Sequence, residues 1–336
     1  MALTLIDSNR ERKDDFSKGV VETFVQECDI LKKLPIATIG TVETSSRRTN
    51  SLPTVGWRAR GETPGAVSGG AHDIVSDAVY SMAGQIDIDK TDYMDKALAE
   101  NPLTSRTREA VKGMSWTFNN AFINGDHATD ADMYEGIKVR IANLASAMTT
   151  YASTSTAELD VRQSAAPTNA VMFQWLDRMD DAIYSLDGHS ADVILTHADM
   201  IKAINSAKRR LGINKDNKEV TEPHLGGSNK RRTSAQPQSK PVADWNGVPM
   251  YDMGLAADQS TDIIATELVN AVATRPIYFL KLGEPYLTGI QQYPLDVTKP
   301  EKLNDGVTYR VTVDWPVGLK DVHPKFGHVV KGQRVA

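Results

Sequence analysis

The 336-residue sequence contains a single cysteine, which excludes a disulfide framework within the chain. No apolar run approaches the roughly 18 residues that a membrane-spanning helix requires. The polar N-terminus, MALTLIDSNRERKDD, lacks the apolar centre of a secretory signal peptide. The net charge is only −5, so the sequence has neither a strong basic field nor an acidic tract. We therefore expect a soluble protein that is made in a cytosol-like compartment and does not contact a membrane.

The sequence also lacks the short motifs of common enzymes: the Gly-x-Ser-x-Gly elbow, the phosphate-binding P-loop and the dinucleotide fingerprint. The dipeptide His72-Asp73 resembles one found in metal phosphohydrolases, but it stands in a Gly-rich segment without further ligands. His197 and Asp199 flank a predicted junction between a strand and a helix, where Asp199 is more simply a helix cap. We therefore predict no catalytic residue, no cofactor and no metal. A soluble metal-dependent hydrolase is kept as an alternative of another class.

The segment NNAFINGDHATDADMYEGIKVRI (119–141) contains acids, a histidine and two glycines, as metal sites do. If Asp126 is taken as the first position of an EF-hand loop, Ala131 stands where glycine is needed and Ile137 where a bidentate acid is needed. The histidine has no second histidine or cysteine at ligand spacing, so zinc is not favoured either. We interpret the segment as a helix that ends at Gly125, then a solvated connector, and then the start of another module. On this interpretation it is a hinge.

Apolar residues make up 40% of the sequence and charged residues 24%, so the chain should bury a core. From Asp15 to Leu34 apolar side chains recur at helical spacing and form a stripe that includes Phe16, Val20 and Phe24. Cys28 lies on this stripe and is expected to be a buried, unreactive thiol. Because only a short polar lead precedes it, we predict that this helix is an arm that packs on another surface.

The composition changes after Pro35. The segment TVETSSRRTNSLPTVGWRARGETPGAVSGGAHD has almost no large aliphatic side chains and cannot form its own core. Strand-like sequences flank it, and within it Val55, Trp57 and Ala59 alternate with smaller or basic residues. We predict a long two-stranded excursion. Because an isolated hairpin is marginally stable in water, its apolar side chains need a partner surface, most economically that of another subunit; a flexible linker is the alternative.

The remaining sequence predicts one long helix followed by a mixed α/β region. The helix begins at Asn101-Pro102, ends near Asn124 and has a strong apolar stripe. The later predicted elements are helices at 169–186 and 198–212, a buried strand at 191–197, and the strands NGVPMYD, TDIIATE, PIYFLKLGEPYLTGI and VTYRVTV. A polar insertion, 211–243, interrupts this region and carries Lys230, Arg231 and Arg232. These three residues are a candidate nucleic-acid contact, although a solvated loop explains them as well.

This order of elements resembles the major capsid proteins of tailed bacteriophages, which have the Hong Kong 97 fold. VVETFVQECDILKKLP resembles the family's arm, SLPTVGWRARGETP its extended loop, and TFNNAFINGD followed by YEGIKVRI the end of its spine helix. NGVPMYD and VDWPVGLKDVHPKFGHVVKG resemble its last strands. The resemblance implies an α+β fold with an N-terminal arm (1–35), an extended β-hairpin loop (36–90), a spine helix with part of the peripheral domain (91–133), a mixed α/β axial domain (134–280) and peripheral strands with a C-terminal return (281–336).

The resemblance also implies the function of a structural protein. Hexamers and pentamers of the chain would form an icosahedral virion shell around double-stranded DNA, made in the cytoplasm of a host bacterium, with scaffolding, portal and decoration proteins as separate partners. The residues that would contact neighbouring subunits are Phe16, Val20 and Phe24 of the arm, and Trp57, Arg58, Arg60 and Glu62 of the extended loop. A cellular nanocompartment shell of the same fold, which holds protein cargo, is the alternative.

Some relatives join a lysine of the extended loop to an asparagine of a neighbouring subunit through an isopeptide bond. The sequence has no lysine between Leu34 and Asp89, and the strongly basic side chains of this segment are arginines. Guanidinium groups stay protonated and are poor nucleophiles. We therefore expect a shell without covalent links between subunits.

Overall fold

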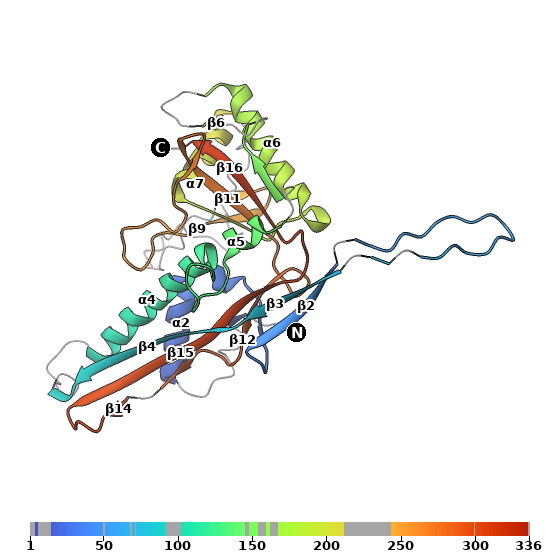
Figure 1. Cartoon of the computed structure of the whole chain (residues 1–336). Coiled ribbons are helices and arrows are strands. Elements are labelled where there is room, and N and C mark those ends of the chain that lie inside the picture. Colours follow the sequence, from blue (N-terminus) through green and yellow to red (C-terminus); the bar gives the residue numbers. More distant parts are fainter. Residues whose placement is uncertain are drawn as a thin grey trace, which may run out of the picture.

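The computed structural model describes residues 4–5, 15–49, 51–67, 69–70, 72–91, 102–144, 148–153, 159–161, 167–211, 243–298 and 300–334, without the side chains of 15–18, 102–104 and 243. Within this part of the chain the strands form a six-stranded, an eight-stranded and a two-stranded sheet. The six-stranded sheet lies in the lower part of Figure 1 with helices α2 and α4, and the eight-stranded sheet lies above it with α6 and α7. The two-stranded sheet extends away from both.

The six-stranded sheet is built around one long strand, β15 (Thr308–Asp321). Strand β4 (Tyr80–Asp89) pairs with it on one side and β12 (Leu287–Gln291) on the other. The remaining strands are β1 (Ile36–Thr38), β13 (Asp296–Val297) and β14 (Glu301–Lys302). Val311, Val313, Trp315, Val317 and Leu319 of β15 are buried at every second position, and from Trp315 on the residues between them, Pro316 and Gly318, are buried as well. This two-residue period gives the sheet one apolar face, as the alternation in the sequence predicts.

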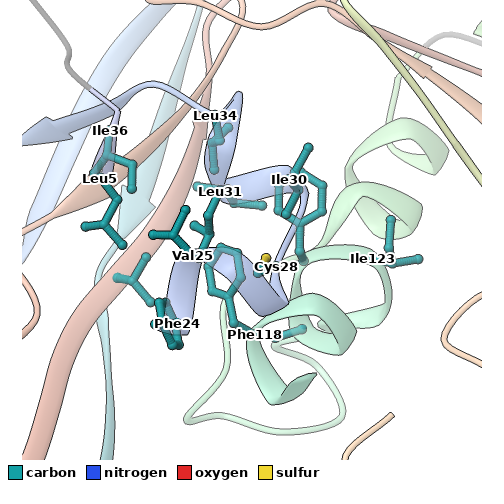
Figure 2. Packing of buried hydrophobic residues seen from close by; sticks show 14 of the residues in the cluster. Leu5, Phe24, Val25, Cys28, Ile30, Leu31, Leu34, Ile36, Phe118 and Ile123 are labelled. Carbon is teal, nitrogen blue, oxygen red and sulfur yellow. The ribbon is translucent and has the colours of Figure 1, made fainter. Parts of the chain in front are cut away.

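Two helices cover the apolar face of this sheet. They are α2 (Asp15–Glu27) and α4 (Pro102–Asn124), and α4 agrees with the predicted long helix. The ring of Phe24 lies 6.5 Å from that of Phe118 on α4 and 5.3 Å from that of Trp315, measured between centroids. Figure 2 shows Phe24, Phe118 and Cys28 in this cluster. Helix α2 ends before the predicted Leu34, because the chain tightens into a 3-10 turn (η1, Ile30–Lys32) that buries Ile30 and Leu31.

The connector after α4 is closed on itself. The N–H of Gly125 donates to the carbonyl of Ala121 at 2.9 Å, and the N–H of Gly136 donates to the carbonyl of Gly125 at 2.8 Å. A Cβ atom on Gly125 would lie 2.4 Å from the carbonyl oxygen of Tyr134, so glycine is required there for close approach of the backbone. Helix α5 (Ile137–Ala142) follows at once. The segment is a connector as predicted, but its ends are tied together, so it is a closed loop rather than a hinge.

The eight-stranded sheet has the central order β5-β16-β11-β7-β9-β8, with β10 beside β11 and β6 beside β16. Its strands are β5 (Thr149–Tyr151), β6 (Leu159–Asp160), β7 (Val193–Thr196), β8 (Ala243–Trp245), β9 (Val248–Asp252), β10 (Glu267–Val269), β11 (Val272–Leu280) and β16 (Gly327–Arg334). Its helices are α6 (Asn169–Ser185) and α7 (Ala198–Arg210), and a 3-10 turn, η4 (Asp187–His189), follows α6. Both helices agree with the predicted ones.

Strand β11 joins two hydrophobic cores. Tyr278 and Leu280 belong to the core shared with the six-stranded sheet, whereas Ile277 and Phe279 belong to the core beneath α6 and α7. A strand buried on both faces reads as a continuous apolar run, as PIYFL does. The prediction of a strand over TDIIATE is wrong, because 261–266 is an irregular segment and β10 begins only at Glu267.

Candidate subunit interface

The extended loop comprises strands β2 (Glu43–Thr49) and β3 (His72–Ala78) and the segment 50–71 between them. The strands are antiparallel, and their register runs from Glu43 opposite Ala78 to Thr49 opposite His72. Figure 1 shows this loop projecting far from both larger sheets. The predicted two-stranded excursion is therefore present. Its hydrogen-bonded ladder lies nearer the body than expected, because no strand is formed over Val55–Ala59.

Large apolar side chains are exposed along this loop. Of the twelve large apolar residues that are exposed in the described part of the chain, five lie in the loop: Leu52, Val55, Trp57, Val67 and Ile74. The side chain of Trp57 is fully exposed. Burying a large apolar side chain is worth about 1.5–3 kcal/mol, so these residues would gain stability from a partner surface. The loop itself is too thin to supply that surface.

The tip of the loop is a turn over residues 59–62, in which the N–H of Glu62 donates to the carbonyl of Ala59 at 3.2 Å. Nη1 of Arg58 donates to the carbonyl of Glu62 at 2.7 Å, and the Glu62 carboxylate accepts from the N–H of Ala59 at 3.1 Å. Gly61 has φ of +91°, which glycine adopts without strain. The structure thus brings Arg58 and Glu62 together within one chain, where they shape the turn. Trp57 and Arg60 are exposed beside it.

The root of the loop is held by a cluster of four charged residues, of which Asp77, Arg140 and Asp321 are buried and Arg48 is partly exposed. Arg48 and Asp77 come from β2 and β3, Arg140 from α5 and Asp321 from the end of β15. Nη1 of Arg140 lies 2.8 Å from Oδ1 of Asp77 and also contacts Asp321, which in turn contacts Nη2 of Arg48. No regular spacing relates these positions in the sequence, so sequence reasoning missed the cluster.

Burial and ion pairing shift the pKa values of this cluster in opposite directions. It raises the pKa of Asp77 above its ordinary value, although Arg140 acts in the opposite direction. Burial lowers the pKa of Arg140, but Asp77 and Asp321 outweigh it and leave that pKa above its ordinary value. Two more bonds fix the guanidinium of Arg140: Nη2 donates to the carbonyl of Leu319 at 2.9 Å and Nε to that of Glu135 at 2.8 Å.

The overall fold is similar to that of several solved capsid and encapsulin structures. The chain matches the holo-SrpI encapsulin complex from Synechococcus elongatus PCC 7942 with a TM-score of 0.59 at 13% identity, over 91% of this chain and 88% of that one. It matches the capsid of an empty GTA particle with a TM-score of 0.58 at 13% identity, over 92% and 90% of the two chains. A chain from Microbacterium phage Oxtober96 gives 0.54 at 11% identity, over 90% of each. No family model matches the sequence, and no curated protein is detectably similar to it.

The chain has the Hong Kong 97 fold. The α+β fold that the resemblance implied is thereby confirmed. In the terms of this fold, α4 is the spine helix, the projecting ribbon is the extended loop, and α2 occupies the place of the arm helix.

The apolar face of the arm helix α2 is buried within its own chain. Val20 is 7% exposed and Phe24 is 0% exposed, and both belong to the core of their own chain. The prediction that these two residues contact another subunit is therefore wrong. They bury against α4 and β15 because the apolar face of the six-stranded sheet needs cover. The side chain of Phe16 lies outside the described residues.

The other candidates from the sequence have structural roles. The thiol of Cys28 is buried and donates to Oδ1 of Asn119 at 2.7 Å, and burial raises the pKa of Cys28 to about 12. The cap of α7 is His197, whose Nδ1 accepts from the N–H of Asp199 at 3.2 Å, so the prediction that Asp199 is the cap is wrong. In the ranges that the structure describes, no group of three or more His, Cys, Asp or Glu side chains could hold a metal ion.

Two further points concern partners. No helix among the described residues is long and apolar enough to cross a membrane. The basic run Lys230, Arg231 and Arg232, the candidate nucleic-acid contact, lies outside the described residues.

Proposed function

We propose that the chain is a major capsid protein of a tailed bacteriophage and that hexamers and pentamers of it form an icosahedral shell around double-stranded DNA. The role is structural rather than catalytic. The shell would be the virion capsid, made in the cytoplasm of the host bacterium. Scaffolding, portal and decoration proteins would be separate partners. The observation that carries the proposal is an exposed apolar loop, on a fold shared with solved capsid and encapsulin structures, that the described part of its own chain does not cover.

The proposed contact is between the loop tip and a neighbouring copy of the chain. Trp57 and Arg60 are the side chains that would reach the neighbour, since both are exposed at the tip. Arg58 and Glu62 would act mainly by shaping the turn from which Trp57 projects. Aromatic and arginine side chains at the centre of an interface commonly contribute most of its binding energy.

The basic run Lys230, Arg231 and Arg232 is proposed to contact the packaged DNA. Lysine and arginine bind phosphates without sequence preference, and a shell that encloses any DNA sequence needs contacts of this kind. Arg209 and Arg210, which are exposed at the end of α7, add positive charge shortly before this run in the sequence.

A nanocompartment shell is the second candidate, favoured by the match to the holo-SrpI encapsulin complex. The two candidates differ in what the particle holds. Particles purified after expression with the rest of a phage genome should contain nuclease-protected double-stranded DNA if the first proposal holds. Particles that instead retain a stoichiometric protein cargo and no DNA would favour the second.

Changes at the loop tip test the proposed contact. Trp57→Ser removes an aromatic side chain that is fully exposed in the single chain, so the fold and its melting temperature should be unchanged while closed particles are lost in negative-stain images. Trp57→Phe keeps an aromatic ring and is the matched control, which should still assemble. If Trp57→Ser forms shells as readily as the unmodified chain, the tip is not the contact.

A further inference from the structure

The buried charged cluster at the loop root joins three parts of the molecule that are far apart in sequence. Arg48 and Asp77 belong to the two strands of the loop, whereas Arg140 and Asp321 belong to the body. The side chains of Arg140, Asp77 and Asp321 are 7%, 3% and 3% exposed, and that of Arg48 is 17% exposed. Each loop strand therefore contributes one charged residue that forms an ion pair with a residue of the body.

Such a cluster restricts geometry more than it adds net stability. Removing charges from water costs about as much as their attraction returns, so a buried ion pair is a weak source of stability. Removing one partner, however, leaves another charge buried and unpaired. Arg140 also donates to two backbone carbonyls, which leaves its guanidinium little freedom to follow a displaced loop. The cluster therefore tolerates few directions of the loop relative to the body.

Because the loop is long, a small rotation at its root produces a large displacement of its tip. From Arg48 to the turn at Gly61 an extended chain spans at most about 43 Å at ~3.3 Å per residue, and a rotation of about 10° at the root would move the tip by roughly 7 Å. A shift of that size would carry Trp57 away from a surface pocket. The backbone bond from the N–H of Val79 to the carbonyl of Val42 at 2.8 Å also holds the root.

We infer that Arg48, Asp77, Arg140 and Asp321 are positioning residues that fix the direction of the extended loop and so decide whether its tip reaches a second copy of the chain. The inference rests on the proposed function for its consequence, since the contact with a second copy belongs to that proposal. The fixed direction itself is a property of one chain and is measured separately.

Spin labels at Ile74→Cys on the loop and Thr117→Cys on α4 report the direction of the loop through the distance between them. Both positions are exposed, and Cys28 can remain because its buried thiol does not react. Labelled chains are diluted into a large excess of unlabelled chains, so that each distance is measured within one chain. Asp77→Asn removes one charge of the cluster. Asp87→Asn, the matched control, breaks the exposed Asp87–Arg310 pair on the neighbouring strand β4, which has a 2.7 Å contact.

The expected result is a broad or shifted distance distribution for Asp77→Asn and an unchanged narrow one for Asp87→Asn. Arg48 supplies a milder pair of variants, because only Nη2 of its guanidinium has an ion-pair partner in the described structure. Arg48→Lys keeps the charge and should keep the narrow distribution, whereas Arg48→Met should lose it. A role in stability alone would lower the melting temperature without broadening the distances.

Particle formation by the same variants is the second measurement. Loss of closed shells in Asp77→Asn and Arg48→Met, but not in Asp87→Asn and Arg48→Lys, supports the inference. A narrow, unshifted distance distribution in both Asp77→Asn and Arg48→Met overturns it, whatever the particles look like. If the unmodified chain forms no shells, the proposed function fails, and the distances alone still decide whether the cluster fixes the loop. If the Asp77→Asn variant does not fold, the distance distribution of Arg48→Met alone decides the test.

Discussion

The imidazole of His328 lies in the interior of the eight-stranded sheet, where it serves as a neutral hydrogen-bonding group. It is 1% exposed. Its Nδ1 lies 2.7 Å from the hydroxyl oxygen of Ser185, and its Nε2 lies 2.8 Å from that of Thr150. Burial lowers the pKa of His328 to about 4. The group is therefore neutral in the folded chain over most of the acidic range, while it is protonated in the unfolded chain below about pH 6.5.

We predict that His328 makes the unassembled protein less stable in acid. As far as His328 is concerned, the free energy of unfolding is highest above about pH 6.5 and falls as the pH drops toward 4. In that window the unfolded chain binds a proton at this residue and the folded chain does not. A shift of this size corresponds to at most about 3 kcal/mol. His328→Gln should flatten the fall in the free energy of unfolding between pH 7 and 5, measured by urea denaturation. His127→Gln, at an exposed position, should keep the full fall, and an equal fall in both variants would exclude His328 as its cause.

The burial of Cys28 followed from its place on a helical stripe, since one period fixes all the residues of a face. The cluster of Arg48, Asp77, Arg140 and Asp321 could not be foreseen, because its members meet only after three separate elements have folded together. The cap at His197 was missed because histidine is an uncommon capping residue.

At the scale of elements, the arm helix is the largest departure from expectation. The apolar stripe of α2 was correctly recognised, but periodicity says only that a face is buried and not which chain buries it. In the structure its partners are α4 and β15 of the same chain. The long helix, α6, α7 and the strands β7, β9, β11 and β15 were predictable from their apolar patterns, whereas strands of two or three residues, such as β5, β6 and β14, were not predicted. The apolar pair Ile263 and Ile264 in TDIIATE suggested a strand, but the structure buries both side chains in an irregular loop.

We predict that α2 is part of the folding core. Phe24→Ala should lower the free energy of unfolding by about 3–5 kcal/mol, because it leaves a cavity beside the rings of Phe118 and Trp315. Gln26→Ala on the exposed face of the same helix should change it by no more than about 0.5 kcal/mol. Deletion of residues 1–30 should give unfolded protein. A soluble, folded deletion variant would revive the idea of an arm that serves only neighbouring subunits.

Gly113 inside the spine helix α4 and Gly125, which follows its last residue, provide a second test. Gly125→Ala should destabilise the protein by about 1–3 kcal/mol, because the new methyl group would lie 2.4 Å from the carbonyl oxygen of Tyr134. Gly113→Ala, inside the helix with nothing within 4 Å, should instead stabilise it by about 0.5–1 kcal/mol. Thermal melts of the two variants check the opposite signs. Small, equal changes in the melting temperature of both variants would mean that the connector backbone moves to make room for the methyl group, as a hinge would.

At the scale of the whole molecule, a well-packed body carries one thin projection whose apolar residues it cannot cover. The body explains the stability of a single chain, and the projection explains why single chains would associate. Sequence reasoning located the projection by its poverty in aliphatic residues, but it placed paired strands too near the tip. Strand pairing depends on which segments lie opposite each other, and a local alternation of residues does not determine this.

We predict that assembled subunits are held together without covalent bonds. The extended loop has no lysine to serve as the amine of an isopeptide link. Particles boiled in detergent should therefore run on a denaturing gel as one band near the 36.8 kDa of the monomer. A ladder of multimers that survives reduction would contradict this expectation.

An electron cryomicroscopy reconstruction of particles formed by the full chain tests the central claim most directly. We expect closed icosahedral shells in which the tip of every extended loop lies on a neighbouring copy and the side chain of Trp57 is buried there. A chain that stays monomeric at all concentrations, or shells in which Trp57 remains in solvent, would contradict the claim.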